Sequence, residues 1–267
     1  LRLRGEMRRL NRTWFTRMLL SYVPAFFILT AFLFFIFFKM LSDSNAAAAR
    51  KSNDFVAKQA QLVIDSSLAA IDQKITLEML RNRTVLQYFT EPSVNELTLQ
   101  VSVMNELSEW KIASPLIHSV YMVRTSDRTV LNMSTTYSLD QYPDAPFVES
   151  VLRSPNGKWS DIRTYKELAS EKGTPVVTLT RRVSIFSGKY GLIVVNVNAA
   201  ALQALVREMY DPAVTRLRLY DNKGNDLFAA STDSPQAPAK SATMASESVS
   251  DYTGWRLVSE IKNARMI

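Results

Sequence analysis

The chain has 267 residues, contains no cysteine and carries a formal net charge of +7 at pH 7. Without cysteine it has no disulfide bonds and no thiolate metal site, so a domain exported from the cell would depend on its hydrophobic core for stability. Six arginines and one glutamate lie in the first seventeen residues, and this arm accounts for +5 of the net charge. The basic balance is therefore concentrated at one end and is not a sign of nucleic-acid binding by the rest of the chain.

An uncharged segment follows the arginine-rich arm and runs for 21 residues from Met18 to Phe38. At about 1.5 Å per residue a helix of this length reaches roughly 31 Å, which matches the hydrocarbon core of a bilayer. Tyr22 and Lys39 lie near its two ends, where membrane helices carry interfacial side chains. We therefore predict a transmembrane helix over residues 18–41.

The arginine-rich arm sets the expected orientation of this helix, because positively charged flanks stay on the cytoplasmic side. Residues 1–17 are then a cytoplasmic arm in the cell membrane, and residues 42–267 are extracellular. A cleaved signal peptide is the alternative, since Ala46 to Ala49 offer a small-residue cleavage site. The anchor is favoured because a signal sequence has an apolar core of about 7–15 residues, which is shorter than the segment here.

Apolar side chains spaced three and four residues apart predict one long helix from Ser42 to Phe89. The helical region as a whole is assigned to residues 42–92. At about 1.5 Å per residue it would extend roughly 70 Å as a rod leaving the membrane. A hairpin of two helices broken near Asp54 or Asp72 is the alternative, although neither position has a glycine or proline. The apolar positions are Val56, Ala60, Ile64, Leu68, Ile71, Ile75 and Met79.

A second helix is predicted after Pro92, where Ser93 and Glu96 form the pattern of a capping box. Pro115 is expected to end it. Its expected buried stripe consists of Leu97, Val101, Met104 and Leu107.

Beyond Pro115 the apolar period changes to two, which is typical of β-strands. We expect a sheet of five strands, accompanied by two shorter helices. The strands cover Ile117–Arg124, Thr129–Met133, Lys158–Tyr165, Val176–Ser184 and Tyr190–Asn198, and the helices cover Phe147–Leu152 and Ala199–Met209.

A smaller unit is expected next, with a β-hairpin of Thr215–Tyr220 and Asp226–Ala230, a loop at Ser231–Ala242 and a closing strand at Trp255–Ile261. The sequence Asp-Asn-Lys-Gly-Asn-Asp at 221–226 has the alternation of an EF-hand loop. It lacks the glutamate at the twelfth position and the flanking helices, so we interpret it as a hairpin turn.

The order of these elements behind a membrane anchor resembles the double-Cache (dCache) family of extracellular sensor domains. The resemblance is carried by YGLIVVNVNAAALQAL at 190–205, RLRLYDNKGNDLF at 216–228 and SDYTGWRLVSEI at 250–261. It implies an α+β fold with an N-terminal transmembrane helix, a long helical rod and two PAS-like (Cache) modules with antiparallel sheets. The membrane-distal module would cover residues 93–209 and the membrane-proximal module residues 210–267.

The arm, the anchor and the early rod are most similar to Bacillota membrane receptors with an AraC-type DNA-binding domain, and next to sensor histidine kinases. The resemblance implies small-molecule sensing, a second membrane span and a cytoplasmic output domain beyond Ile267 that regulates transcription. Nucleic acid would be contacted only through that output domain. The long helix favours a homodimer. A membrane-tethered binding or assembly protein without signalling output is the alternative function, and an enzyme is disfavoured because no paired catalytic residues stand at useful spacing.

The resemblance places a ligand over the sheet of the distal module. Asn196 lies five residues after Gly191, where many relatives have an aspartate that holds the ammonium group of a ligand. Aromatic rings, one amide and nearby arginines would suit a polar organic molecule. Simple core packing is an equal alternative for Trp159 and Tyr165. The expected ligand-binding set is Tyr121, Trp159, Arg163, Tyr165, Arg181 and Asn196.

Two departures from the amino-acid-binding relatives bear on the ligand. Those relatives have an arginine two residues before the tryptophan, where this chain has Gly157, and Asn196 replaces their aspartate. With both charged anchors missing, a neutral ligand is expected rather than an α-amino acid. The resemblance to Bacillota receptors, which often accompany carbohydrate uptake, implies a sugar as the first expectation. The single histidine, His118, lies on a predicted strand without a cluster of other ligands, so we expect no metal, no cofactor and no catalytic site.

Overall fold

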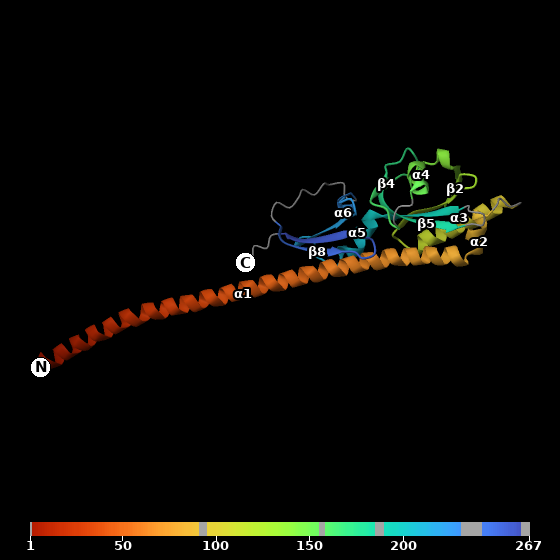
Figure 1. Ribbon diagram of the computed structural model, residues 1–267. Coiled ribbons are helices and arrows are strands. Elements are labelled where there is room, and N and C mark those ends of the chain that lie inside the picture. Colours follow the sequence, from red (N-terminus) through yellow and green to blue (C-terminus); the bar gives the residue numbers. More distant parts are fainter. Residues whose placement is uncertain (1, 91–94, 155–157, 185–189, 231–241, 263–267) are drawn as a thin grey trace. The chain divides into compact units, whose positions relative to one another are not determined.

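The computed structural model describes residues 2–90, 95–154, 158–184, 190–230 and 242–262 (Figure 1). The chain divides into two compact units, and the second begins at Asn53. This second unit contains the two β-sheets and the helices packed on them.

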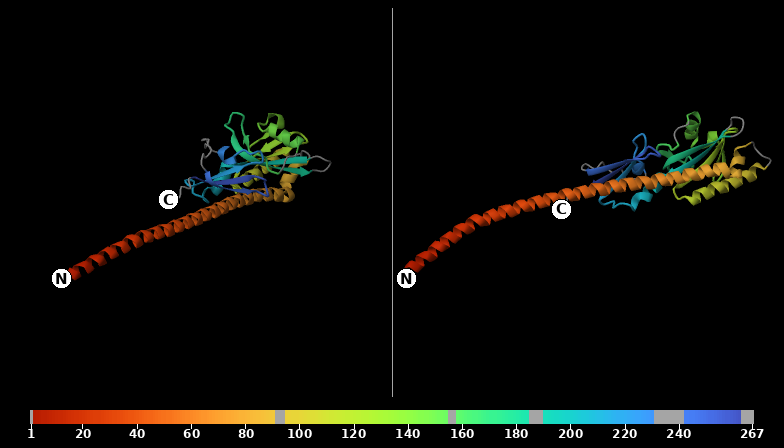
Figure 2. Two further views of the ribbon diagram at one scale, coloured as in Figure 1. Left: turned by 60° about the vertical axis from the view of Figure 1, so that its left-hand side comes forward. Right: turned by 60° about the horizontal axis from the view of Figure 1, so that its bottom comes forward.

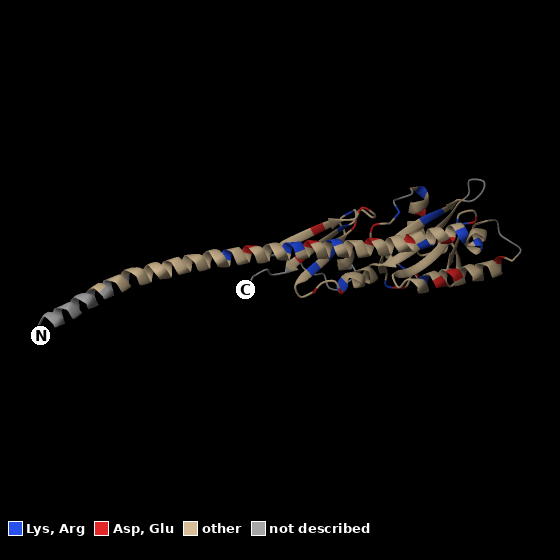
Figure 3. Ribbon diagram, turned by 90° about the horizontal axis from the view of Figure 1, so that it is seen from below, with Lys and Arg blue, Asp and Glu red and all other residues tan. Residues whose placement is uncertain are grey.

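The first helix, α1, runs from Arg2 to Arg81 and contains the expected transmembrane segment. Among the described residues, one helix is long and apolar enough to cross a membrane, and it lies here, with none of its most apolar window buried in the protein. Figure 3 shows a long part of this helix without charged residues. Phe34, for example, exposes 69% of its surface. Exposed aromatic and aliphatic side chains at this density suit a lipid environment.

The predicted rod ends earlier than expected, because α1 stops at Arg81 and a separate short helix, α2, covers Arg83–Phe89. The expectation of one helix to Phe89 is therefore wrong, and so is the alternative break at Asp54 or Asp72. Asn82 separates the two helices, and its side-chain oxygen accepts a hydrogen bond from the Val85 amide at 3.2 Å. An asparagine that caps a new helix competes with continuing the old one.

Burial confirms the predicted apolar stripe of α1 from Ala60 to Ile75, whereas Val56 and Met79 are only half-buried. Its apolar stripe packs into the larger core cluster, while the opposite side of the helix is exposed. The buried members of the stripe are Ala60, Ile64, Leu68, Ile71 and Ile75.

The next helix, α3, covers Glu96–Ala113 and follows Asn95. Ser93 of the expected capping box lies outside the described residues. The expected stripe is partly wrong, because Leu97 is 78% exposed and Val101 is exposed as well. The buried face is instead made by Val103, Leu107 and Trp110, spaced four and three residues apart. Trp110 has a larger side chain than Leu97 or Val101, and its burial determines which face of the helix packs against the sheet.

Within the described residues the larger sheet has six antiparallel strands in the order β3-β2-β1-β6-β5-β4, one strand more than expected. The added strand is β3, which pairs with β2 at the sheet edge. At the other edge, β4 is much shorter than the predicted strand, and Trp159 makes only an isolated bridge to Leu179. The strands are β1 Ile117–Arg124, β2 Thr129–Asn132, β3 Thr136–Ser138, β4 Arg163–Tyr165, β5 Thr174–Ser184 and β6 Tyr190–Asn198.

The two faces of this sheet are covered differently (Figures 1 and 2). Side chains such as Val120 and Val195 pack on one face in a cluster that includes α1, α2 and α3. Side chains such as Val123 and Val194 pack on the other face in a smaller cluster. That second face is covered by the 3₁₀ helix η1 (Leu139–Gln141) and by α4 (Ala145–Arg153).

The smaller sheet has three strands in the order β7-β9-β8 and follows helix α5 (Ala199–Arg207). β7 covers Thr215–Tyr220, as expected, and β9 covers Arg256–Lys262. β8, at Ala242–Val249, was not expected. Most of the predicted loop, residues 231–241, lies outside the described residues.

The predicted return strand at Asp226–Ala230 is wrong, because Leu227–Ala230 forms a helical turn, α6. Asp226 accepts hydrogen bonds from the amides of Phe228 and Ala229, at 3.0 and 3.1 Å. An aspartate that satisfies the first amides of a helix stabilises its start. Leu227 and Phe228 are buried in the larger core cluster, which the helical turn makes possible.

Candidate functional site

The alternation of strand residues decides which predicted site residues share a face. Tyr121, Arg163, Tyr165 and Asn196 lie on the face covered by α4. Arg181 lies on the opposite face with Leu179 and Val183, since these residues are two apart on β5. Trp159 also packs on that opposite face. The structure therefore brings four of the six predicted residues together and places the other two elsewhere.

Arg163 forms the centre of the polar cluster on the α4 face. Its two terminal nitrogens donate to the two carboxylate oxygens of Asp144, at 2.6 and 2.8 Å. The Tyr121 hydroxyl donates to Asp144 Oδ2 at 2.6 Å. Asp144 immediately precedes α4 but makes no capping hydrogen bond with its side chain, which extends to the sheet instead. A paired, bidentate arginine and carboxylate thus lie in a mostly buried position.

Asn196 is fully buried and uses its amide on both sides. Its oxygen accepts from Arg163 Nη2 and from the Thr178 hydroxyl, both at 2.8 Å. Its nitrogen donates to Ser119 Oγ at 2.9 Å. Arg163 Nε also donates to Thr178 Oγ1, at 2.7 Å. Both ends of the Asn196 side-chain amide are therefore hydrogen-bonded, as is usual for a buried amide.

Aromatic rings surround this polar cluster. The Arg163 guanidinium lies 3.7 Å from the centre of the Phe147 ring. The rings of Tyr121 and Tyr142 meet edge to face with centres 5.0 Å apart, and the hydroxyls of Tyr142 and Tyr165 are 3.1 Å apart. Burial raises the pKa of Tyr121 and of Tyr142, so both phenols stay protonated. The cluster gathers a guanidinium, a carboxylate, an amide and phenol groups beside aromatic rings, and these are the kinds of groups that bind a small polar molecule.

Several members of this cluster were not found from the sequence. Ser119 and Thr178 alternate with the aliphatic residues of their strands in the same register as Tyr121 and Asn196, and this alternation could have found them. Asp144, Tyr142 and Phe147 lie in a loop and a short helix, where no period indicates the direction of a side chain. Gly157, the position compared with relatives, lies outside the described residues.

The two residues on the opposite face belong to a second polar group. Arg181 Nε donates to Asp72 Oδ1 of α1 at 2.7 Å. Trp159 Nε1 donates to the Tyr252 hydroxyl at 3.3 Å, and that hydroxyl donates to Asp72 Oδ2 at 2.9 Å. Lys158 forms an ion pair with the same carboxylate. Asp72 therefore joins α1 to the larger sheet and to the loop before β9.

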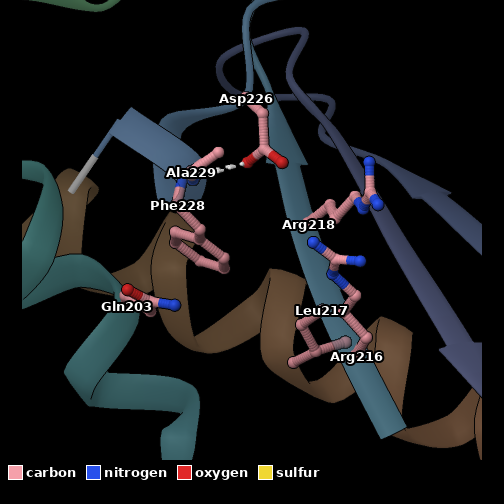
Figure 4. A pocket seen from close by; sticks show the side chains of 7 residues that line it. All are labelled: Gln203, Arg216, Leu217, Arg218, Asp226, Phe228 and Ala229. Atoms are coloured by element: carbon pink, nitrogen blue, oxygen red, sulfur yellow. Dashed lines mark hydrogen bonds between the residues drawn. The ribbon is translucent and has the colours of Figure 1, made fainter. Parts of the chain in front are cut away.

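A small cavity lies beside β7 in the smaller sheet (Figure 4). The Arg216 side chain extends along β7, the Arg218 guanidinium is turned away from the Asp226 carboxylate, and that carboxylate accepts a hydrogen bond from the Ala229 amide. Arg218 also lies 3.7 Å from Glu260 and donates to the Tyr220 hydroxyl. The cavity holds about 20 Å³, which is room for a single water. It is too small for an organic ligand.

Asp221 belongs to the segment 221–226, which has the alternation of an EF-hand loop. Both of its carboxylate oxygens accept hydrogen bonds from nitrogen donors. Oδ1 accepts from the amides of Lys223 and Asn225, at 2.9 and 2.8 Å. Oδ2 accepts from the Asn225 side chain and from the Ile162 amide. These contacts fit the interpretation as a turn. Among the described residues, no cluster of three or more histidine, aspartate or glutamate side chains could hold a metal ion.

Comparisons with solved structures identify the fold. The chain is similar to the ligand-binding domain of the Campylobacter jejuni chemoreceptor Tlp3 in complex with L-valine, with a TM-score of 0.52 and 14% identity over 84% of this chain and 96% of that one. It is similar to a methyl-accepting chemotaxis protein X, with a TM-score of 0.56 and 9% identity over 82% and 100%. The chain has the fold of a Cache-like sensor domain.

A third similar structure is the Tlp3 sensory domain with isoleucine bound, at a TM-score of 0.52 and 15% identity over 84% of this chain and 96% of that one. No family model matches the sequence, and no curated protein matches it. The Cache-like α+β fold that the sequence resemblance implied is confirmed. The AraC-type output and the residues that bind ligand stay predictions.

Proposed function

We propose that this chain is the ligand-sensing input module of a transmembrane signalling receptor. The observation that carries the proposal is the Arg163–Asp144 pair, buried under α4 with Asn196 and Tyr121, in a fold that is similar to solved sensory domains. The apolar stretch of α1 supports a membrane anchor. The arm before it is then cytoplasmic, and the sheets are extracellular. An AraC-type domain or a histidine kinase is the output, and the chain acts as a homodimer.

The charges in the cluster favour a zwitterionic ligand over a neutral sugar. The sugar expectation rests on the resemblance to receptors that accompany carbohydrate uptake and on two missing charged anchors, but Arg163 and Asp144 supply both signs of charge side by side. Separating a buried ion pair is costly unless each charge finds a new partner. An α-amino acid offers a carboxylate to Arg163 and an ammonium group to Asp144, whereas a sugar offers only hydroxyl groups. We therefore propose an α-amino acid as the ligand class.

Calorimetric titration of the full chain in nanodiscs tests this proposal, with L-valine, L-isoleucine and neutral monosaccharides as probes. We expect an amino acid to bind and Arg163→Gln to weaken that binding at least about tenfold, because a charged hydrogen-bond partner is lost. Arg181→Gln is the matched control, since Arg181 lies on the opposite face of the sheet. Sugar binding without amino-acid binding, or equal effects of the two variants, would contradict the proposal.

The proposed orientation has its own test, which the lack of native cysteine makes direct. Single cysteines are introduced at Gly5 in the arm and at Asn222, which is exposed. A membrane-impermeant maleimide should label Asn222→Cys in intact cells and Gly5→Cys only after the cells are permeabilised. The reverse pattern would overturn the orientation.

A further inference from the structure

Six consecutive residues connect the Arg163 cluster to the rest of the second unit. We name residues 158–163 the linking segment. Its last residue, Arg163, holds Asp144, Thr178 and Asn196 on the α4 face. The segment lies at the edge of the larger sheet, where β4 pairs with β5 on one side only. A segment at an edge can shift without breaking the inner strand pairs.

The residues just before Arg163 contact the smaller sheet. The Ile162 amide donates to Asp221 Oδ2 at 3.1 Å. The Asp161 carboxylate forms an ion pair with Lys223 at 3.1 Å. Asp221 is buried, and both it and Lys223 lie in the turn that follows β7. If Arg163 moves, Ile162 and Asp161 move with it because they precede it in the chain, and their contacts with Asp221 and Lys223 change.

The beginning of the linking segment contacts α1 and the loop before β9. Lys158 pairs with Asp72 of α1 and lies over the Tyr252 ring, with its nitrogen 4.7 Å from the ring centre. Trp159 donates to the Tyr252 hydroxyl, which in turn donates to Asp72. The Asp72 carboxylate is buried, so its hydrogen bond from the Tyr252 hydroxyl is not readily exchanged for water, whereas the Lys158 side chain is 35% exposed.

We infer that the linking segment transmits the state of the Arg163–Asp144 pair to the smaller sheet and to α1. A ligand that takes Arg163 from Asp144 shifts residues 158–162, and the contacts with Asp221, Tyr252 and Asp72 shift with them. Coupling of this kind requires that the Arg163–Asp144 pair and the contacts of residues 158–162 favour the same conformation of the linking segment. A change at either end then affects the other end equally. The regulation rests on the proposed sensing function, but the coupling is measured without any ligand.

The test is hydrogen exchange, followed by mass spectrometry, on the full chain in nanodiscs. Asp144→Asn removes the charge that faces Arg163 and keeps the shape of the side chain. We expect exchange in residues 158–163 and 250–254 to rise about tenfold, the effect of losing one interaction with a charged group. Asp140→Asn is the matched control, because Asp140 is an exposed carboxylate close to α4 that pairs with Arg128. It should leave both regions unchanged.

The reverse perturbation starts at the other end. Tyr252→Phe removes the hydroxyl between Trp159 and Asp72 and should raise exchange in residues 144–153 and 163–165. If Asp144→Asn fails to fold, Arg163→Gln perturbs the same pair. Changes confined to α4, with residues 250–254 as in the unaltered chain, overturn the inference. Amino-acid binding without coupled exchange overturns only the inference, and coupled exchange without amino-acid binding overturns only the proposed ligand.

Discussion

Substitution of the Asp72 carboxylate is expected to lower the stability of the folded protein. It lies on α1 with 6% of its surface exposed and holds Arg181, Lys158 and Tyr252. Burial acts to raise the pKa of Asp72, but the hydrogen bonds from these three partners outweigh it and lower the pKa below its ordinary value of 3.8. The charged form is therefore the one that stabilises the folded protein.

The substitution Asp72→Asn keeps the shape and replaces one acceptor oxygen by a donor nitrogen that faces Tyr252 and Lys158. A hydrogen bond to a charged group contributes about 1.5–3 kcal/mol. The Lys158 side chain is 35% exposed and can turn to water, so its share is discounted. We expect a loss of about 2–3 kcal/mol, which lowers Tm by roughly 4–12 °C for a unit of this size.

Thermal unfolding of the full chain, followed by circular dichroism, measures this difference across pH. Because the pKa is lower in the folded state, the stabilisation is fully present above the ordinary value and is lost as the pH falls through the folded pKa. The gap in Tm between the two chains should stay constant from about pH 7 to pH 5 and close only below about pH 4. Asp54→Asn, an exposed aspartate on the same helix, is the control. A loss below about 1 kcal/mol, or a gap already closed at pH 5, would refute the reasoning.

Three further outcomes follow from packing, capping and the apolar helix. Gly191→Ala should destabilise the folded protein by about 1–3 kcal/mol in thermal unfolding, because the added carbon overlaps the buried Phe89 ring. Adding Phe89→Leu to this variant should recover part of the lost stability. Equal stability of the chains with glycine and with alanine at position 191 would contradict this reasoning. Asp226→Ala should cost about 1 kcal/mol in urea unfolding through the lost α6 cap, whereas Asp226→Asn, which keeps an acceptor oxygen at the same position, should cost less; equal costs would contradict the capping role. Phe34→Arg should raise the free energy of membrane insertion by about 3–4 kcal/mol, seen as a smaller carbonate-resistant fraction; an unchanged fraction would argue against a spanning helix.

Strands with a strong apolar alternation could be predicted closely from the sequence. The bounds of β1, β6 and β7 agree with the expected strands, because their inward residues are large and β-branched or aliphatic. β8 was missed because its residues are mostly small and polar, as at an edge strand. The α6 turn was missed because it depends on the cap from Asp226 and on tertiary burial of Leu227, neither of which a local pattern shows.

The candidate site shows the same division between local and tertiary information. Strict alternation along β5 places Thr178 and Arg181 on opposite faces, so the sequence alone could have separated Arg181 from Asn196. Asp144 could not be found this way. It stands before a short helix and could have been an ordinary cap. Only the folded arrangement shows that it pairs with Arg163 instead.

That pairing makes a final prediction about ligand chemistry. A ligand that binds Arg163 alone leaves the Asp144 carboxylate buried, with the Tyr121 hydroxyl as its one remaining side-chain partner among the described residues. Breaking a buried pair on one side costs about 3–5 kcal/mol, of which partial solvent access returns some. 3-Methylbutanoate, which is valine without its ammonium group, should therefore bind roughly 100-fold more weakly than L-valine in calorimetric titration. In Asp144→Asn the gap should narrow, since the unpaired charge is gone. Equal affinity of the two compounds for the unaltered chain would show that Asp144 does not face the ligand.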